Sequence, residues 1–132
     1  AKRLVESIIL KMVKKSLIKK NSKILIMGIT FKEDCPDIRN SKVFNILKDL
    51  SNYPFRLKAV DPYYTESNLN QKNIEFDNKI DFKEKYDVIL LLVAHKEFKK
   101  LKIKEWNKLI NENGIFFDLK GIIPRELNPL RI

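Results

Sequence analysis

The sequence predicts an α/β protein with a Rossmann-like, three-layer fold, a mostly parallel sheet and an amphipathic helix at its N-terminus. Two observations predict this fold. Short, continuously apolar segments alternate with segments of helical periodicity, which favours a parallel sheet with helices on both faces. The length of 132 residues suits one such domain with its own core. Ligands of such sheets bind beyond the carboxyl ends of the strands.

The first elements are a helix and a buried strand. Residues 4–18 place apolar side chains at helical spacing with lysines between them, which predicts an amphipathic helix. The polar run at 19–22 ends this helix. Residues 23–29 then form a short apolar run, typical of a strand buried on both faces.

A strand–helix–strand unit follows from the next segments. After a polar loop at 30–40, residues 41–50 resume helical spacing, with Asn40 or Ser41 as the expected N-cap. Residues 55–60 alternate in polarity and predict a second strand.

The second half of the chain contains the strongest strand signal. Residues 88–93 predict a central buried strand, and residues 74–76 predict a short one before it. Helical spacing extends over residues 96–113, and Gly114 is expected to end that helix. Residues 115–118 predict the last strand.

Composition excludes several classes of protein. A single cysteine, Cys35, allows no internal disulfide, and no cysteine–histidine cluster has metal-ligand spacing. Without a bilayer-spanning apolar run or signal-peptide features, we expect a cytoplasmic protein that binds no membrane. The net charge of +10 suggests a nucleic-acid partner, but the lysines are scattered and no arginine cluster is present. We therefore expect a solvated lysine-rich surface and no nucleic-acid partner.

The loop after the first strand has the chemistry of a phosphate site built from side chains. After Gly28 it contains no further glycine, so the backbone cannot approach a pyrophosphate as a GxGxxG loop does. It carries Phe31, Lys32 and Arg39 instead. A lysine and an arginine on one loop can bind one diphosphate or two phosphate ligands. The alternative is a surface loop in which both cations pair with its acidic residues, Glu33, Asp34 and Asp37.

Four stretches together resemble one known family. Residues 28–41 (GITFKEDCPDIRNS), 61–62 (DP), 93–98 (VAHKEF) and 118–121 (DLKG) resemble the UDP-binding domain of the UDP-glucose/GDP-mannose dehydrogenase family. The resemblance covers about residues 23–123. It implies one domain of an NAD-dependent nucleotide-sugar 6-dehydrogenase, which oxidises the sugar C6 alcohol to a carboxylate.

The resemblance also implies roles for individual residues. Phe31 and Lys32 are implied to bind the nucleotide sugar, with the lysine at the diphosphate. Lys120 stands where UDP-glucose members carry a nucleotide-binding arginine, so it keeps the charge and loses the planar fork. Arg39 is implied to reach NAD, which the family binds mainly through an N-terminal domain. No metal site is implied.

The same resemblance narrows the substrate and predicts an inactive fragment. The pair Cys35-Pro36 resembles members that act on UDP-N-acetylhexosamines in capsule and surface-polysaccharide synthesis, so we expect UDP-N-acetylglucosamine or an epimer. The family's Gly-rich catalytic cysteine motif is absent. Cys35 is therefore interpreted as structural, and the isolated chain as inactive. The full enzyme is expected to be a homo-oligomer.

Several interpretations stay open. Residues 1–20 are predicted to be a helix leading from a preceding central domain, and residues 21–132 the UDP-sugar-binding domain; alternatively, the helix packs on this domain's own sheet. His95 either contacts ligand or is fixed by local hydrogen bonds. The alternative function is a stand-alone α/β binding module for a nucleotide or another phosphorylated ligand.

Overall fold

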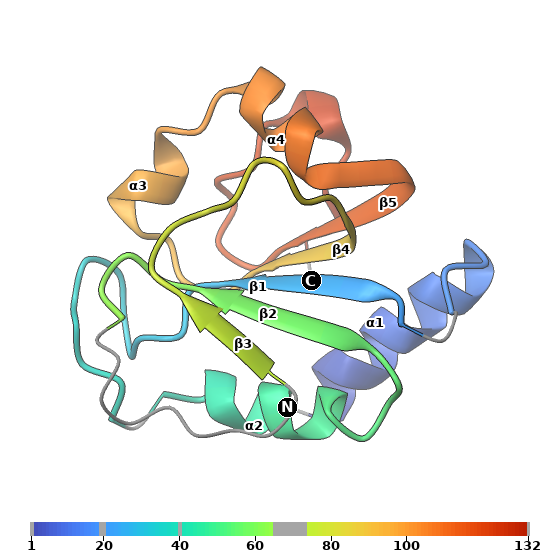
Figure 1. The fold of residues 1–132 in the computed structure, drawn as a ribbon, viewed down its shortest axis with the longest axis horizontal. Helices are drawn as coiled ribbons and strands as arrows, with labels where there is room; N and C mark the ends of the chain where they lie inside the picture. Colours follow the sequence, from blue (N-terminus) through green and yellow to red (C-terminus); the bar gives the residue numbers. More distant parts are fainter. Residues whose placement is uncertain (1, 19–20, 40, 65–73, 132) are drawn as a thin grey trace.

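A five-stranded, wholly parallel sheet forms the centre of the computed structural model, which describes residues 2–18, 21–39, 41–64 and 74–131 (Figure 1). The strand order is β3-β2-β1-β4-β5. The strands are β1 (Lys23–Met27), β2 (Arg56–Val60), β3 (Ile74–Asp77), β4 (Tyr86–Leu91) and β5 (Ile110–Asp118). This sheet confirms the predicted α/β, Rossmann-like fold, including the short strand expected at 74–76.

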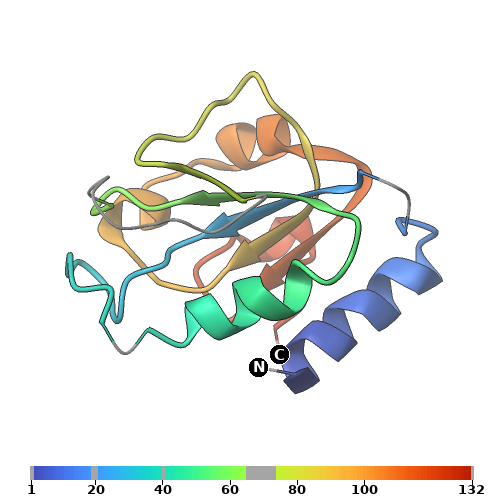
Figure 2. The same cartoon turned by 60° about the horizontal axis from the view of Figure 1, so that its bottom comes forward.

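Helices cover both faces of the sheet. Those described are α1 (Lys2–Lys14), α2 (Val43–Leu50), α3 (Lys96–Lys99), α4 (Ile103–Leu109) and a 3₁₀ turn, η2 (Arg125–Leu127). Figures 1 and 2 show α1 and α2 on one face, and α3 and α4 on the other. No helix in the described part of the chain has the length and apolar character needed to span a membrane.

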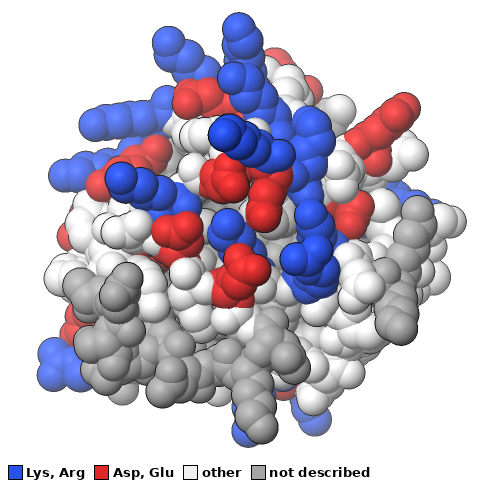
Figure 3. Space-filling model, in the orientation of Figure 1, with Lys and Arg blue, Asp and Glu red and all other residues white. Residues whose placement is uncertain are grey.

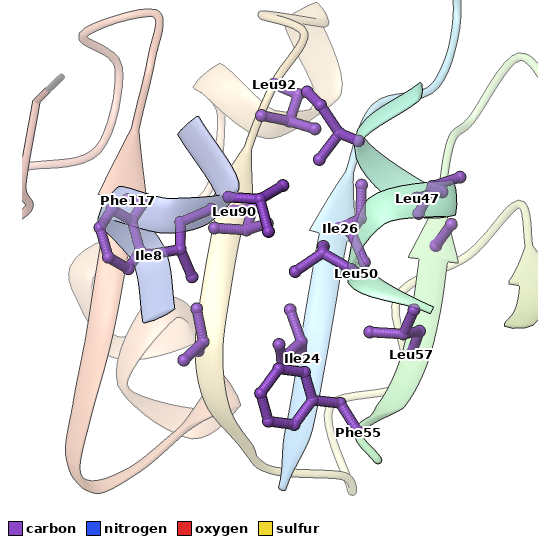
Figure 4. Close-up of a cluster of buried hydrophobic side chains, with 14 of the residues drawn as sticks. Ile8, Ile24, Ile26, Leu47, Leu50, Phe55, Leu57, Leu90, Leu92 and Phe117 are labelled. Atoms are coloured by element: carbon purple, nitrogen blue, oxygen red, sulfur yellow. The ribbon is translucent and has the colours of Figure 1, made fainter. Parts of the chain in front are cut away.

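The alternation of side chains along the strands produces two cores. Ile24 and Ile26 of β1 face α1 and α2, whereas Leu25 and Met27 face α3 and α4. Figure 4 shows the first core, to which α1 contributes Ile8. Each fully buried side chain of this size contributes about 1.5–3 kcal/mol relative to an exposed one.

Helix α1 packs on the same core as α2. Val5, Ile8 and Met12 are buried there, while Leu10 and Val13 are exposed. The apolar stripe therefore covers this domain's own sheet, as one of the two interpretations expected. The helix ends at Lys14, earlier than the predicted residue 18.

The predicted helix at 96–113 is wrong. Two short helices, α3 and α4, occupy its first part, and β5 begins at Ile110, directly after α4. Asn111 belongs to β5, and its side-chain amide donates a hydrogen bond to Asp87 of β4 at 3.1 Å. Gly114 lies within β5 at a shift in the pairing with β4, so it does not end a helix.

The expected N-cap of α2 differs in detail. The helix begins at Val43, so Lys42 occupies the N-cap position. Ser41 still contributes, because its hydroxyl accepts from the Val43 N–H at 3.3 Å and donates to the Ile29 carbonyl at 2.7 Å. Asn40, the other expected cap, lies outside the described residues.

Candidate functional site

The loops after β1 and β4 begin side by side where the strand order reverses. Strand β1 pairs with β2 on one side and with β4 on the other. The loops after β1 and β4 therefore turn to opposite faces of the sheet, and such a divergence leaves a crevice at the carboxyl edge. At their starts the two loops are in close contact, and Gly28 allows this contact. Its φ is +97°, and a Cβ at this position would lie 2.5 Å from the Cβ of Val93. Gly28 and Val93 are thus packed so closely that no side chain fits at position 28.

A buried carboxylate, Asp61, joins the loops after β1 and β2. One of its oxygens accepts from the backbone N–H groups of Ile29 (2.7 Å) and Thr30 (3.1 Å). Its other oxygen accepts from the Tyr63 N–H at 2.8 Å. The side chain is 0% exposed, so these bonds take the place of hydrogen bonds to water.

His95 adds the loop after β4 to this network. Its Nδ1 accepts from the Asp34 N–H at 2.9 Å, so the proton of the neutral ring is on Nε2, which lies 2.9 Å from Asp61 and 3.0 Å from the Thr30 hydroxyl. The ring is 0% exposed and does not line the cavities described below. His95 is thus fixed by local hydrogen bonds, the second of its two expected roles.

The network controls the charge of Asp61. Burial is the largest single influence and raises its pKa, but the hydrogen bonds from His95 and from backbone N–H groups together outweigh it. The pKa of Asp61 therefore lies below its ordinary value of 3.8. The carboxylate stays ionised and keeps its acceptors available to the loops.

A second buried aspartate, Asp118, shapes the loop after β5. Its oxygens accept from the N–H groups of Lys120 (3.1 Å), Gly121 (2.8 Å) and Ile123 (2.8 Å). The Arg131 guanidinium lies 3.5 Å away. This arrangement fixes the backbone that carries Lys120.

Two cavities adjoin at this edge and share the lining residues Phe31, Leu92, Val93 and Lys120. The first, of about 340 Å³, is called here the lysine cavity; it is lined by Phe31, Lys32, Glu33, Leu92, Val93, Ala94, Lys99, Lys120 and Ile122. The second, of about 420 Å³, is the apolar cavity; it is lined by Leu4, Thr30, Phe31, Ser41, Lys42, Val43, Ile46, Leu92, Val93, Leu119 and Lys120. The fold thus brings Lys120 together with Phe31 and Lys32, which are far from it in the sequence.

Arg39 lies apart from both cavities. Its side chain is 85% exposed and makes a two-pronged pair with Asp37, at 3.0 and 3.1 Å. The hydrogen bond from Arg39 is the main reason that the pKa of Asp37 is lowered. The alternative expected from the sequence, in which the loop cations pair with acidic residues of the loop, is therefore correct for Arg39. It is not correct for Lys32, which has no acidic partner in the described part of the chain.

A larger cavity of about 530 Å³ lies at the opposite, amino-terminal edge of the sheet. Its cations, Lys23, Arg56 and Lys58, are accompanied by Glu75 and Glu84. Glu84 lies 3.6 Å from Lys58 and accepts the Tyr86 hydroxyl at 2.7 Å. Because two carboxylates offset most of the positive charge within the cavity, and no predicted site residue lines it, it is a weaker candidate despite its size.

Other chemistry finds little support in the described ranges. They hold no group of three or more His, Cys, Asp or Glu side chains that could bind a metal ion. Cys35 is a half-buried free thiol. Figure 3 shows basic side chains over the half with α3 and α4, with acidic side chains among them.

Sequence reasoning missed the roles of Asp61 and Asp118 and the presence of Lys99 in the lysine cavity. Asp61 is recognisable in the sequence only as the Asp of an Asp-Pro pair that ends a strand. Asp61 directly follows β2 and Asp118 is the last residue of β5, and this position at the carboxyl edge of the sheet was the available signal. Lys99 offered none, because its sequence context is that of a solvated helix surface.

Comparison with known proteins links the chain to one family. Residues 25–125 match the description "UDP-glucose/GDP-mannose dehydrogenase family, UDP binding domain". The chain is 36% identical to Protein CapL of Staphylococcus aureus over 126 residues, covering 93% of this chain and 29% of that protein. It is 29% identical to UDP-N-acetyl-D-glucosamine 6-dehydrogenase of Salmonella typhi over 127 residues, covering 96% of this chain and 30% of that protein.

Solved structures agree on the fold. The UDP-N-acetyl-mannosamine dehydrogenase Cap5O from S. aureus superposes with a TM-score of 0.64 at 27% identity, over 92% of this chain and 26% of that one. A UDP-D-ManNAc dehydrogenase from Pyrococcus horikoshii gives a TM-score of 0.70 at 20% identity, over 92% of this chain and 27% of that one, and so supports the fold alone. The chain spans about 30% of the length of the curated relatives it matches.

Proposed function

The chain belongs to the UDP-glucose/GDP-mannose dehydrogenase family, in the region of its UDP-binding domain, and from this premise we propose that it binds the UDP part of a nucleotide sugar in the lysine cavity. One observation carries the proposal: Lys32 and Lys120 line a single cavity at the point where the strand order reverses. Point charges on opposite loops suit a diphosphate, whose oxygens are spread along its length.

Phe31 supplies the apolar part of the proposed site. Its side chain is 55% exposed although it is a large aromatic, and it lines both cavities. An exposed aromatic beside lysines can pack against a base or sugar ring while the phosphates are bound. The apolar cavity next to it accepts the less polar part of the ligand.

We propose further that the chain acts within a larger NAD-dependent enzyme that oxidises the C6 alcohol of a UDP-N-acetylhexosamine, for polysaccharide synthesis. The names of relatives from S. typhi and S. aureus support this substrate class. When bound, NAD would accept the hydride. The loop after Gly28 contains no further glycine, so we assign the dinucleotide mainly to another domain, and in this chain only Arg39 is assigned toward it.

The remaining assignments concern the whole enzyme. We propose a cytoplasmic homo-oligomer whose other domains supply the dinucleotide site and the catalytic cysteine, so that this chain alone does not reduce NAD. The acidic side chains among the lysines favour a solvated surface over a nucleic-acid interface. Residues 1–20 are proposed to connect to the preceding domain and residues 21–132 to form the UDP-sugar-binding domain.

Replacing Lys32 with alanine should weaken UDP binding by about 1–3 kcal/mol, the usual contribution of a charge-assisted contact. Isothermal titration calorimetry of UDP with this chain measures the change. Arg39→Ala is the control, because Arg39 is a cation of the same loop that pairs with Asp37 outside the cavity. We expect UDP affinity to be retained in Arg39→Ala. An equal loss in both variants would indicate a general charge effect and would contradict the proposed site.

A further inference from the structure

The lysine cavity contains a third lysine that the proposed function does not use. Lys99 lies at the end of α3, next to Phe98, which is buried and anchors this short helix. Lys99 lines the cavity together with Lys32 and Lys120. Lys32, on the loop after β1, and Lys99, on the helix that follows β4, therefore approach the cavity from the two walls of the crevice.

In this structure Lys99 pairs with the carboxylate of Glu33. The Lys99 Nζ lies 3.3 Å from Glu33 Oε2, and the two side chains are 47% and 57% exposed. A pair with this exposure contributes little to stability, so exchanging its carboxylate for another anion costs little. Glu33 is also the one acidic side chain among the residues that line the cavity.

Backbone contacts hold the two walls in place independently of this pair. The Lys96 N–H donates to Asp34 Oδ1 at 2.8 Å, and the Asp34 N–H donates to His95 at 2.9 Å. The loop and α3 thus stay together if the Glu33 carboxylate moves away. Side-chain exchange at Lys99 does not require the fold to open.

We infer that Lys99 is a further phosphate-binding residue, and that Glu33 occupies it until the ligand's diphosphate takes the place of the carboxylate. This inference rests on the proposed function and extends it. Under this inference Glu33 competes with the ligand for Lys99. A Glu33–Lys99 pair that only stabilised the fold would not compete with the ligand. The charges of three lysines and one glutamate leave a cationic cavity that matches a nucleoside diphosphate.

The test is calorimetry of UDP with this chain and variants of the pair. Lys99→Ala should weaken UDP binding about tenfold, and Lys99→Arg, which keeps the charge, should restore most of it. Glu33→Gln should strengthen binding about threefold, because the competing charge is removed while the size is kept. The controls are Lys100→Ala and Glu112→Gln, both at exposed positions that line none of the cavities described above. Neither should change the affinity more than about twofold.

Two outcomes would overturn the inference. If the UDP affinity of Lys99→Ala equals that of Lys100→Ala while Lys32→Ala still weakens binding, Lys99 does not bind the phosphates and the proposed function stands. If Glu33→Gln weakens binding together with Lys99→Ala, the pair is a structural clasp. Failure of the unaltered chain to bind UDP, or an unchanged affinity in Lys32→Ala, would instead overturn the proposed function itself.

Discussion

Replacing Asp61 with asparagine is expected to lower the free energy of unfolding by about 3 kcal/mol. The buried carboxylate accepts from the N–H groups of Ile29, Thr30 and Tyr63, and from His95. An asparagine offers one oxygen, and its NH₂ group would face donors, so buried N–H groups lose their acceptor. Urea denaturation followed by circular dichroism at neutral pH measures the loss.

Asp77→Asn is the matched control for this change. Asp77 ends the neighbouring strand β3, is only half-buried, and accepts from the exposed turn at Asn78 and Lys79. We expect it to cost less than about 1 kcal/mol. Equal losses in the two variants would show that the Asp61 network adds nothing beyond an ordinary turn.

The pH dependence of stability follows from the same carboxylate. Because the folded-state pKa of Asp61 lies below its ordinary value of 3.8, its stabilisation is complete above that value. It is lost as the pH falls through the lower, folded-state pKa. Stability of the unaltered chain should therefore fall below about pH 4, and Asp61→Asn should lose less stability over that range.

Replacing Gly28 with alanine is expected to lower the free energy of unfolding by about 3 kcal/mol or more. The new Cβ would lie 2.5 Å from the Cβ of Val93 and 2.9 Å from its backbone nitrogen. Relief requires the loops after β1 and β4 to separate. The φ of +97° adds a strain that L-residues rarely tolerate.

Gly121→Ala separates these two causes. Gly121 also has a positive φ, +76°, but a Cβ there meets no atom within 4 Å. Its substitution should cost only the backbone strain, about 1 kcal/mol. Thermal or urea unfolding of both variants gives the comparison, and a similar cost for the two would refute the close contact at Val93.

Much of the fold was predictable because its signals are local. The strands at 23–29 and 88–93 have continuous apolar runs, and the sheet that contains them follows from their alternation with helices. The segment at 96–113 was not predictable, because helical spacing there continues into residues that pair with Tyr86 and Asp87. Tertiary pairing overrides that local pattern.

The sequence predicted the loop residues that line the site, but not the buried residues that hold these loops in place. Lys32 and Lys120 follow strands whose carboxyl ends must meet at one edge, so they could be expected together. The carboxylate of Asp61 serves partners at Ile29 and His95, more than thirty positions away in either direction. No local pattern indicates which loop a buried acid will hold, so these contacts require the structure.

The most direct test of the proposed UDP site is a chemical-shift titration of the ¹⁵N-labelled chain with UDP. The proposal predicts that the perturbed amides cluster at residues 29–34, 92–99 and 119–122, around the lysine cavity. Uridine without phosphates should perturb the loop at Lys32 far less, because the diphosphate carries the contact. Perturbations centred on Arg56, Lys58 and Glu84, at the opposite edge of the sheet, would contradict the proposed site.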